Sequence, residues 1–187
     1  MALATVDEIT MKTFLEGEPA SEVKHEFVDG QVYAMASASE RHNRIALNIA
    51  FHLRAASRGG ACRAFISDML LHVPSHNAFY YPDVMLVCDP DDRESRYKSA
   101  PCLIVEVLSE STESIDRREK WLGYRQLPSL RHYLLVSQDK RQMECYSRRH
   151  PDDAWQHQAF EPDGKLTLVC ESLTLRLSLA DIYEDVG

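Results

Sequence analysis

Two acidic residues stand in stretches that are otherwise apolar, and they are the clearest chemical signal in the sequence. Glu106 lies in the middle of residues 103–108 (LIVEVL), which have the composition of a buried strand. Burying a carboxylate costs on the order of several kcal/mol of folding free energy unless the group is paired, hydrogen-bonded or metal-bound. Asp83 opens the next apolar stretch upstream, 23 residues before Glu106. That separation is enough for a strand, a loop and a returning strand, so both carboxylates are expected at one edge of a sheet.

Carboxylate oxygens in such a pair suit Mg²⁺ or Mn²⁺. The alternative for Glu106 is a structural ion pair with Lys120 or an arginine. The alternative for Asp83 is a turn or capping role at the entrance of a strand.

A polar stripe follows Glu106 in the sequence. Asp116, Lys120 and Tyr124 are spaced four apart in a segment expected to be helical, so they share one face. Beside an acidic site, this stripe would present an ammonium group to a phosphate or to an activated water. On its own, the stripe is as well explained by a surface Asp–Lys pair.

Three further polar residues are candidates of lower rank. Glu26 opens a predicted hairpin strand, Asp68 interrupts an apolar run, and His42 stands at the start of the first long helix. Acids in such places are more often structural than catalytic. The remaining histidines are scattered and suggest no zinc triad.

The elements that position these residues can be predicted from periodicity and turn signals. Helices are expected over residues 5–16, 41–57 and 112–127, and a hairpin over 26–35 about the turn Asp29-Gly30. Strands are expected over residues 64–73, 83–88, 103–108, 132–137, 142–147, 155–160, 165–169 and 173–179. This order predicts an α/β fold of mixed α+β type, with a central mixed β-sheet flanked by helices.

Length and composition limit the possible classes of protein. A chain of 187 residues suits one domain over 1–187, with an N-terminal helix and hairpin at about 5–35, a core at about 41–137 and C-terminal strands at about 142–179. No apolar run is long enough to span a bilayer, and the N-terminus has no signal-peptide pattern. We therefore expect a cytoplasmic protein with no membrane association.

Charge and cysteine content give two further expectations. The net charge of −8 counts against tight nonspecific DNA binding, although a local basic groove or a bound metal would offset it. The five cysteines are widely separated, with no C-x-x-C pair, so we expect neither a disulfide framework nor a structural zinc site.

Taken together, several segments resemble the Uma2 (DUF820-type) family of restriction-endonuclease-like proteins. The matching segments are KHEFVDGQVYAM (24–35), HNRIALNIAFHL (42–53), FISDMLL (65–71), YPDVMLV (81–87), LIVEVLSESTESIDRREKWLGYR (103–125) and HYLLVSQD (132–139). The resemblance covers residues 5–186. It implies a restriction-endonuclease-like core and membership of the PD-(D/E)XK phosphodiesterase superfamily.

The resemblance also implies roles for particular residues. Asp83, Glu106 and the carbonyl of Val107 would hold Mg²⁺ or Mn²⁺, and Glu26 resembles an additional acid that many superfamily members carry. The superfamily's usual Glu-x-Lys places a lysine where this chain has Leu108. Lys120 is the candidate for a lysine displaced onto the neighbouring helix. Asp68 and His42 match family-typical positions without a clear role.

Three functions remain open from the sequence. The first is a metal-dependent nuclease, with DNA the favoured nucleic acid. The second is a catalytically decayed module that binds a partner or forms oligomers, including a homodimer, which the acidic charge and Leu108 favour. The third is a metal-dependent hydrolase of a small phosphorylated molecule.

Overall fold

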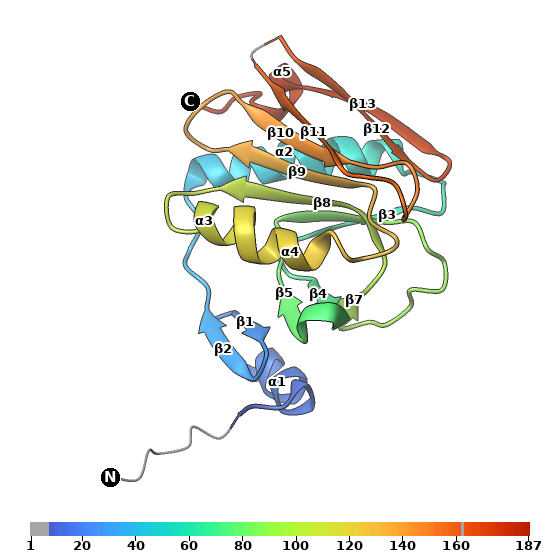
Figure 1. The fold of residues 1–187 in the computed structure, drawn as a ribbon. Coiled ribbons are helices and arrows are strands. Elements are labelled where there is room, and N and C mark those ends of the chain that lie inside the picture. The colour runs from blue at the N-terminus through green and yellow to red at the C-terminus, as the bar shows by residue number, and fades with distance from the viewer. Residues whose placement is uncertain (1–7, 162) are drawn as a thin grey trace.

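The computed structural model describes residues 8–161 and 163–187, which form three β-sheets with helices packed around the largest one (Figure 1). The strand order is β11-β10-β9-β8-β6-β3 in the six-stranded sheet, β2-β1-β5-β4-β7 in the five-stranded sheet and β12-β13 in the third. The large sheet is mixed, because β8 and β9 run parallel while its other neighbouring strands are antiparallel. The predicted fold class is confirmed, although the strands are distributed over three sheets.

The element bounds follow the chain order. The helices are α1 (Met11–Gly17), η1 (Glu18–Ala20), α2 (Glu40–Ala56), η2 (Pro74–His76), α3 (Glu113–Ile115), the π-helix η3 (Asp116–Lys120), α4 (Trp121–Tyr124) and α5 (Leu179–Ile182). The strands of the first half are β1 (His25–Val28), β2 (Gln31–Ala34), β3 (Arg63–Ile66), β4 (Leu70–Val73), β5 (Ala78–Tyr80), β6 (Val84–Val87) and β7 (Tyr97–Lys98). Those of the second half are β8 (Pro101–Leu108), β9 (His132–Ser137), β10 (Met143–Ser147), β11 (Gln156–Phe160), β12 (Lys165–Cys170) and β13 (Leu173–Ser178).

Strand β8 is the centre of the fold, and all eight of its residues are buried. Its side chains alternate between two hydrophobic clusters, as the two-residue period of a strand requires. Leu103, Val105 and Val107 pack in the cluster that includes α2, whereas Ile104 and Leu108 pack in the cluster that includes α4. Glu106 shares the second face, so its carboxylate is directed towards the segment that carries Lys120.

Helix α2 covers the first of these faces. Ser39 caps its N-terminus by accepting a hydrogen bond from the His42 amide at 3.1 Å. Ile45, Ile49 and Leu53 are buried at helical spacing against the sheet. This packing fixes the first turn of α2, and with it His42, at one end of β6 and β8.

The N-terminal hairpin is tied to the smaller sheet. Asp29 and Gly30 both have positive φ, at 46° and 85°, and they join β1 to β2. A two-residue turn of this kind favours Asn or Asp followed by Gly, as the sequence predicted. Strand β1 also pairs with β5, which places Glu26 next to the chain leading into β6.

Several predicted elements require correction. The single strand expected over 64–73 is two strands, β3 and β4, which lie in different sheets and are separated by a turn at Ser67 and Asp68. The predicted helix over 112–127 is interrupted by the π-helix and ends at Tyr124. Strands β5 and β7 and helix α5 were not predicted. The helix expected over 5–16 is described only from Glu8 onward and begins at Met11.

The expectation of no disulfides is wrong for this structure. Cys62 is bonded to Cys88 and Cys102 to Cys170, while Cys145 is free and buried. Separations of 26 and 68 residues show no local signal, because the pairing depends on β3 lying beside β6 and on β12 lying near the start of β8.

No described helix has the length and apolar character needed to cross a membrane.

Candidate functional site

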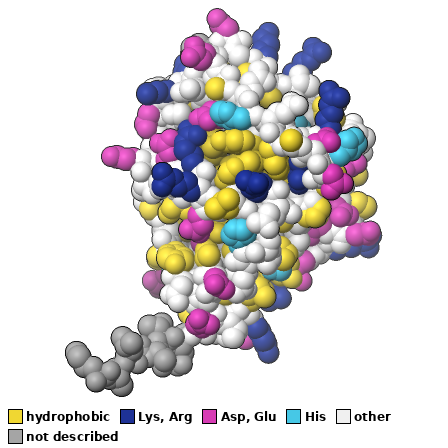
Figure 2. Space-filling model, viewed as in Figure 1, with side chains coloured by type: hydrophobic (Ala, Val, Ile, Leu, Met, Phe, Trp, Pro, Cys, Tyr) yellow, Lys and Arg dark blue, Asp and Glu magenta, His cyan; other side chains and the backbone are white. Residues whose placement is uncertain are grey.

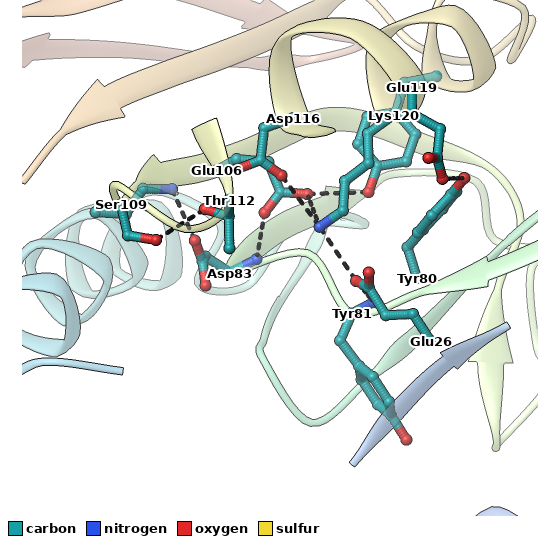
Figure 3. A network of polar contacts seen from close by, with 12 residues as sticks. Glu26, Tyr80, Tyr81, Asp83, Glu106, Ser109, Thr112, Asp116, Glu119 and Lys120 are labelled. Atoms are coloured by element: carbon teal, nitrogen blue, oxygen red, sulfur yellow. Dashed lines mark hydrogen bonds and ion pairs between the residues drawn. The ribbon is translucent and has the colours of Figure 1, made fainter. Parts of the chain in front are cut away.

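Asp83 and Glu106 meet across neighbouring strands, as the sequence predicted. Val84 pairs with Val105 in the β6–β8 register, so Asp83, just before β6, lies opposite Glu106. The Asp83 amide donates to Glu106 Oε2 at 3.4 Å, and the Val107 amide donates to Asp83 Oδ2 at 2.7 Å (Figure 3). The two acids are therefore held by each other's strand.

Lys120 occupies the position expected of a displaced lysine. Its ammonium lies 3.3 Å from Glu106 Oε1, 3.1 Å from Glu26 Oε1 and 3.2 Å from Asp116 Oδ1 (Figure 3). The side chain is only 7% exposed. The predicted contact with Glu106 is confirmed, and the lysine also bridges to the N-terminal hairpin through Glu26.

The charges around Lys120 do not balance. Three carboxylates surround one ammonium group, and Glu106 and Asp116 are 3% and 2% exposed. Burial lowers the pKa of Lys120, but Glu106, Glu26 and Asp116 outweigh it and hold the pKa well above its usual value. Burial raises the pKa of Glu106 and of Asp116, with Lys120 opposing both shifts. The cluster therefore contains more acidic groups than cations, and a bound cation or proton would offset the difference.

Tyr124 contacts Glu106 rather than Lys120. Its hydroxyl donates to Glu106 Oε1 at 2.9 Å, and the side chain is fully buried. Glu106 thus accepts from Tyr124, Lys120 and the Asp83 amide, which fixes the orientation of its carboxylate. The stripe predicted from the sequence does converge on the site, with Asp116 against Lys120 and Tyr124 against Glu106.

His42 reaches the same place from the other face of the sheet. Its Nε2 lies 3.1 Å from Asp83 Oδ2, and both side chains are 15% exposed. Burial alone would lower the pKa of His42, but the hydrogen bond and charge of Asp83 outweigh it and raise the pKa. His42 therefore belongs to the rim of the site, where solvent can reach.

Glu26 joins the site through the chain that precedes Asp83. Glu26 Oε1 accepts a hydrogen bond from the Tyr81 amide at 3.2 Å, and the same oxygen lies 3.1 Å from the Lys120 ammonium. Glu26 is 14% exposed, so it forms a second part of the accessible rim.

One predicted residue lies elsewhere. Asp68 forms an ion pair with Lys24, and its side chain is 75% exposed. The turn between β3 and β4 carries Asp68 away from β6 and β8, because the apolar run that it interrupts is not one continuous strand.

Tyr80 and Glu119 belong to the network but were not predicted from the sequence. The Tyr80 hydroxyl donates to Glu119 Oε1 at 3.2 Å, and its ring lies 5.6 Å from the Lys120 ammonium. Burial raises the pKa of Tyr80, so the hydroxyl stays protonated. The available signal was its place in the segment that leads directly into Asp83.

The oxygen donors present fit a divalent cation of the Mg²⁺ type. Within residues 8–161 and 163–187, no three His, Cys, Asp or Glu side chains are grouped to hold a metal ion by themselves. Mg²⁺ does not require such a cage, because it commonly uses one or two carboxylates and keeps several waters. Asp83, Glu106 and the Val107 carbonyl would supply such donors, and the negative excess around Lys120 favours a cation.

Comparison with known proteins identifies the family of this chain. Residues 11–180 match the model of the Uma2 family, described as "Putative restriction endonuclease". The uncharacterised protein slr1290 of Synechocystis is 33% identical over 185 residues, covering 98% of this chain and 96% of that protein. A second uncharacterised Synechocystis protein, sll1609, is 32% identical over 151 residues, covering 79% and 85%.

A solved structure shows the same fold. The crystal structure of a putative nuclease belonging to DUF820 from Anabaena variabilis aligns with a TM-score of 0.74 at 18% identity. The alignment covers 96% of this chain and 99% of that one. The family match over most of the chain, together with this shared fold, shows that the chain belongs to the Uma2 family.

Proposed function

We propose that this protein is a metal-dependent phosphodiesterase that hydrolyses nucleic acid. The observation that carries the proposal is the pairing of Asp83 with Glu106 across β6 and β8, with the Lys120 ammonium 3.3 Å from Glu106. Two acids and a lysine in this relation are the parts that phosphodiester hydrolysis needs. The family description and the fold of the Anabaena protein support the same class of reaction.

The proposed roles follow from the contacts. Asp83, Glu106 and the carbonyl of Val107 would hold Mg²⁺ or Mn²⁺, which polarises a phosphate and lowers the pKa of water. Lys120 keeps its proton because three acids surround it, and its fixed charge would stabilise negative charge developing on phosphoryl oxygens. His42 and Tyr124 position Asp83 and Glu106 respectively.

Substrate approach is expected at the rim formed by His42, Asp83 and Glu26. These side chains are 14–15% exposed, whereas Glu106, Asp116 and Lys120 lie beneath them at 2–7%. Glu26 stands where it would bind a second cation or act through a water.

The test compares cleavage of single- and double-stranded DNA and RNA of one sequence in Mn²⁺. Wild type is expected to cut at least one form, and Asp83→Ala should reduce cutting to background. Asp68→Ala is the matched control, because it removes an acid that lies outside the site, so its activity should equal that of wild type. Equal activity of Asp83→Ala and wild type would refute the assignment.

The two alternative functions give different results in the same assay. Hydrolysis of a simple phosphodiester, with no nucleic acid cut, would favour a small phosphorylated substrate. Neither reaction, combined with no metal-induced change in melting temperature, would favour a decayed module.

A further inference from the structure

A row of partly buried aromatic side chains packs between α4 and the neighbouring strands β9 and β10. Trp121 stacks on Tyr146 with ring centroids 4.3 Å apart, and Tyr146 stacks on His157 at 4.6 Å. Trp155 packs edge-on against Trp121 at 5.0 Å. We call these four residues the aromatic platform. None of them is fully buried, so the platform keeps part of its ring surface in contact with solvent.

The platform rests on a rigid base. Trp121 lies nearly parallel to the fully buried Tyr133, at 5° and 5.6 Å between centroids. Tyr133 in turn packs edge-on against Tyr124, whose hydroxyl holds Glu106. A ligand that stacked on these rings would therefore meet surfaces whose orientation is already fixed.

Two arginine side chains lie beside the platform, and the acid Glu144 contacts its His157 at 2.9 Å. The Arg125 guanidinium lies 6.0 Å from the Trp121 ring, and that of Arg148 lies 4.5 Å from the Trp155 ring. Arg118 and Arg125 are exposed, and neither forms an ion pair within the described residues. Figure 2 shows a hydrophobic patch in the middle of this face, with Lys or Arg side chains within and beside it.

The sequence around the platform is basic although the chain is acidic. Residues 117–149 hold nine Lys and Arg against three Asp and Glu, a balance of +6 in a chain whose net charge is −8. The basic residues are Arg117, Arg118, Lys120, Arg125, Arg131, Lys140, Arg141, Arg148 and Arg149. Lys120 is buried among three acids and Arg117 is paired with Glu113 and Glu144, so the positive charge that a ligand could meet comes from the other seven residues.

We propose that the aromatic platform binds single-stranded nucleic acid, which names the substrate form of the phosphodiesterase proposed above and rests on that proposal. Unpaired bases stack on aromatic rings, and a basic surface attracts the phosphates between them. Bases in a duplex are hidden from such a surface. The arginines favour a polyanion over an apolar protein segment as the occupant. Lys120 and Trp121 are consecutive in the chain, so the platform adjoins the segment that supplies the site with its ammonium group.

The chain carries its own probe for this proposal. Its two tryptophans, Trp121 and Trp155, both belong to the platform. Oligo(dT) added in EDTA, where metal-dependent cleavage is prevented, should quench tryptophan fluorescence. A duplex of the same length should need at least about a ten-fold higher concentration. No quenching by the single strand, or equal affinity for the duplex, would overturn the proposal.

Variants locate the binding and separate charge from stacking. Trp155→Phe leaves one tryptophan in the platform, and the quenching of Trp121 should persist. Arg125→Glu should weaken oligo(dT) binding by about ten-fold or more, since it replaces a phosphate-binding charge with a repelling one. Arg54→Glu, an exposed arginine on α2 with the same charge change, is the control. Equal weakening by both variants would overturn the assignment to this surface.

The same measurements distinguish this proposal from the proposed activity. Asp83→Ala should bind oligo(dT) as wild type does while failing to cut it. Cleavage by wild type without any quenching would overturn the platform and leave the phosphodiesterase standing. Quenching by oligo(dT) with no cleavage of any nucleic acid would support the platform and overturn the phosphodiesterase. A fluorescence change that depends only on protein concentration would assign the platform to a second copy of the chain instead.

Discussion

The two ends of strand β8 are held by different kinds of interaction. At its start, Cys102 is bonded to Cys170 on β12, and the Cys62–Cys88 disulfide lies beside them, with both of its sulfurs within 4.0 Å of the Cys170 carbonyl. Towards its end, Glu106 is buried in a cluster of acids that share one lysine. Disulfide bonds therefore hold the start of β8, whereas the segment near Glu106 is held by ion pairs in which acids outnumber the lysine.

This difference indicates a division of labour along one strand. The disulfide end constrains the chain without a bound ion, because covalent bonds hold it. The charged end is stable only to the extent that protons or cations offset its acids. Perturbations of the two ends should therefore respond differently to metal, reductant and pH.

The largest effect is expected from Lys120→Met. Removing the Lys120 ammonium from the three acids that contact it should lower the free energy of unfolding by about 3–5 kcal/mol and abolish the proposed nuclease activity. Urea unfolding and the Mn²⁺ cleavage assay measure the two effects. Lys24→Met, which breaks an exposed Lys–Asp pair, should cost less than about 1 kcal/mol. A cost for Lys120→Met as small as that of the control would show that the acids do not depend on the lysine.

The next effect concerns the disulfide end. Replacing Cys102 and Cys170 together with alanine should lower the free energy of unfolding by about 2–4 kcal/mol, since the bond closes a long loop. The metal-induced shift in melting temperature should remain. Cys145→Ala, which leaves both disulfides in place, should stay as sensitive to reductant as wild type. Loss of the metal response in the Cys102/Cys170 variant would show that the two ends are coupled.

Metal addition probes the charged end directly. Mg²⁺ or Mn²⁺ at about 100 times its dissociation constant should stabilise wild type by about 2.7 kcal/mol. Glu106→Gln should keep the fold and remove this response, while Asp68→Asn, on the surface, should retain it. An equal shift in melting temperature for Glu106→Gln and wild type would place the ion elsewhere.

The smallest effect is a difference in pH dependence between the ends. Burial lowers the pKa of His132, at the start of β9, below its ordinary value of 6.5, so stability is lost as pH falls below that value. Burial raises the pKa of Glu106 and Asp116, so their contribution to stability falls as pH rises. The difference in free energy of unfolding between wild type and His132→Asn measures the contribution of His132. This difference should change by at most about 1.4 kcal/mol per pH unit. A difference that does not change between pH 7 and 5 would contradict it.

The sequence predicted the charged end much better than the covalent end. Glu106 in an apolar strand, Asp83 one strand earlier and Lys120 on the following helix are local signals, and the strand pairing that joins them is short-range. The structure confirms the contacts of these residues, while their catalytic roles stay predictions. The Cys102–Cys170 disulfide depends on a contact between β8 and β12 across 68 residues, and the Cys62–Cys88 disulfide on the pairing of β3 with β6, neither of which a local pattern encodes.

Two other errors have the same physical origin. The run over residues 64–73 is mostly apolar, with Ser67, Asp68 and His72 as its polar residues, so periodicity alone could not show that β3 and β4 join different sheets. Local pattern reports which face of a strand is buried, but it does not report which strand lies alongside. The alternation of apolar and polar residues in β12 and β13, by contrast, could be recognised without a distant partner, because the two strands pair with each other.

The π-helical turn at Asp116–Lys120 has a consequence for insertions and deletions in related sequences. A π-turn holds one more residue than an α-helical turn, which is the state left by a single-residue insertion. Deleting Arg118, an exposed residue within it, would restore regular α-helix and rotate everything on one side by about 100° relative to the other. The residues that follow the deletion, Lys120 and Tyr124 among them, would then no longer keep their present orientation relative to the residues that precede it. Chains of this fold that lack the extra residue should therefore carry their cation at a different position, and an alignment gap here would mark a change of active-site architecture rather than neutral loop variation.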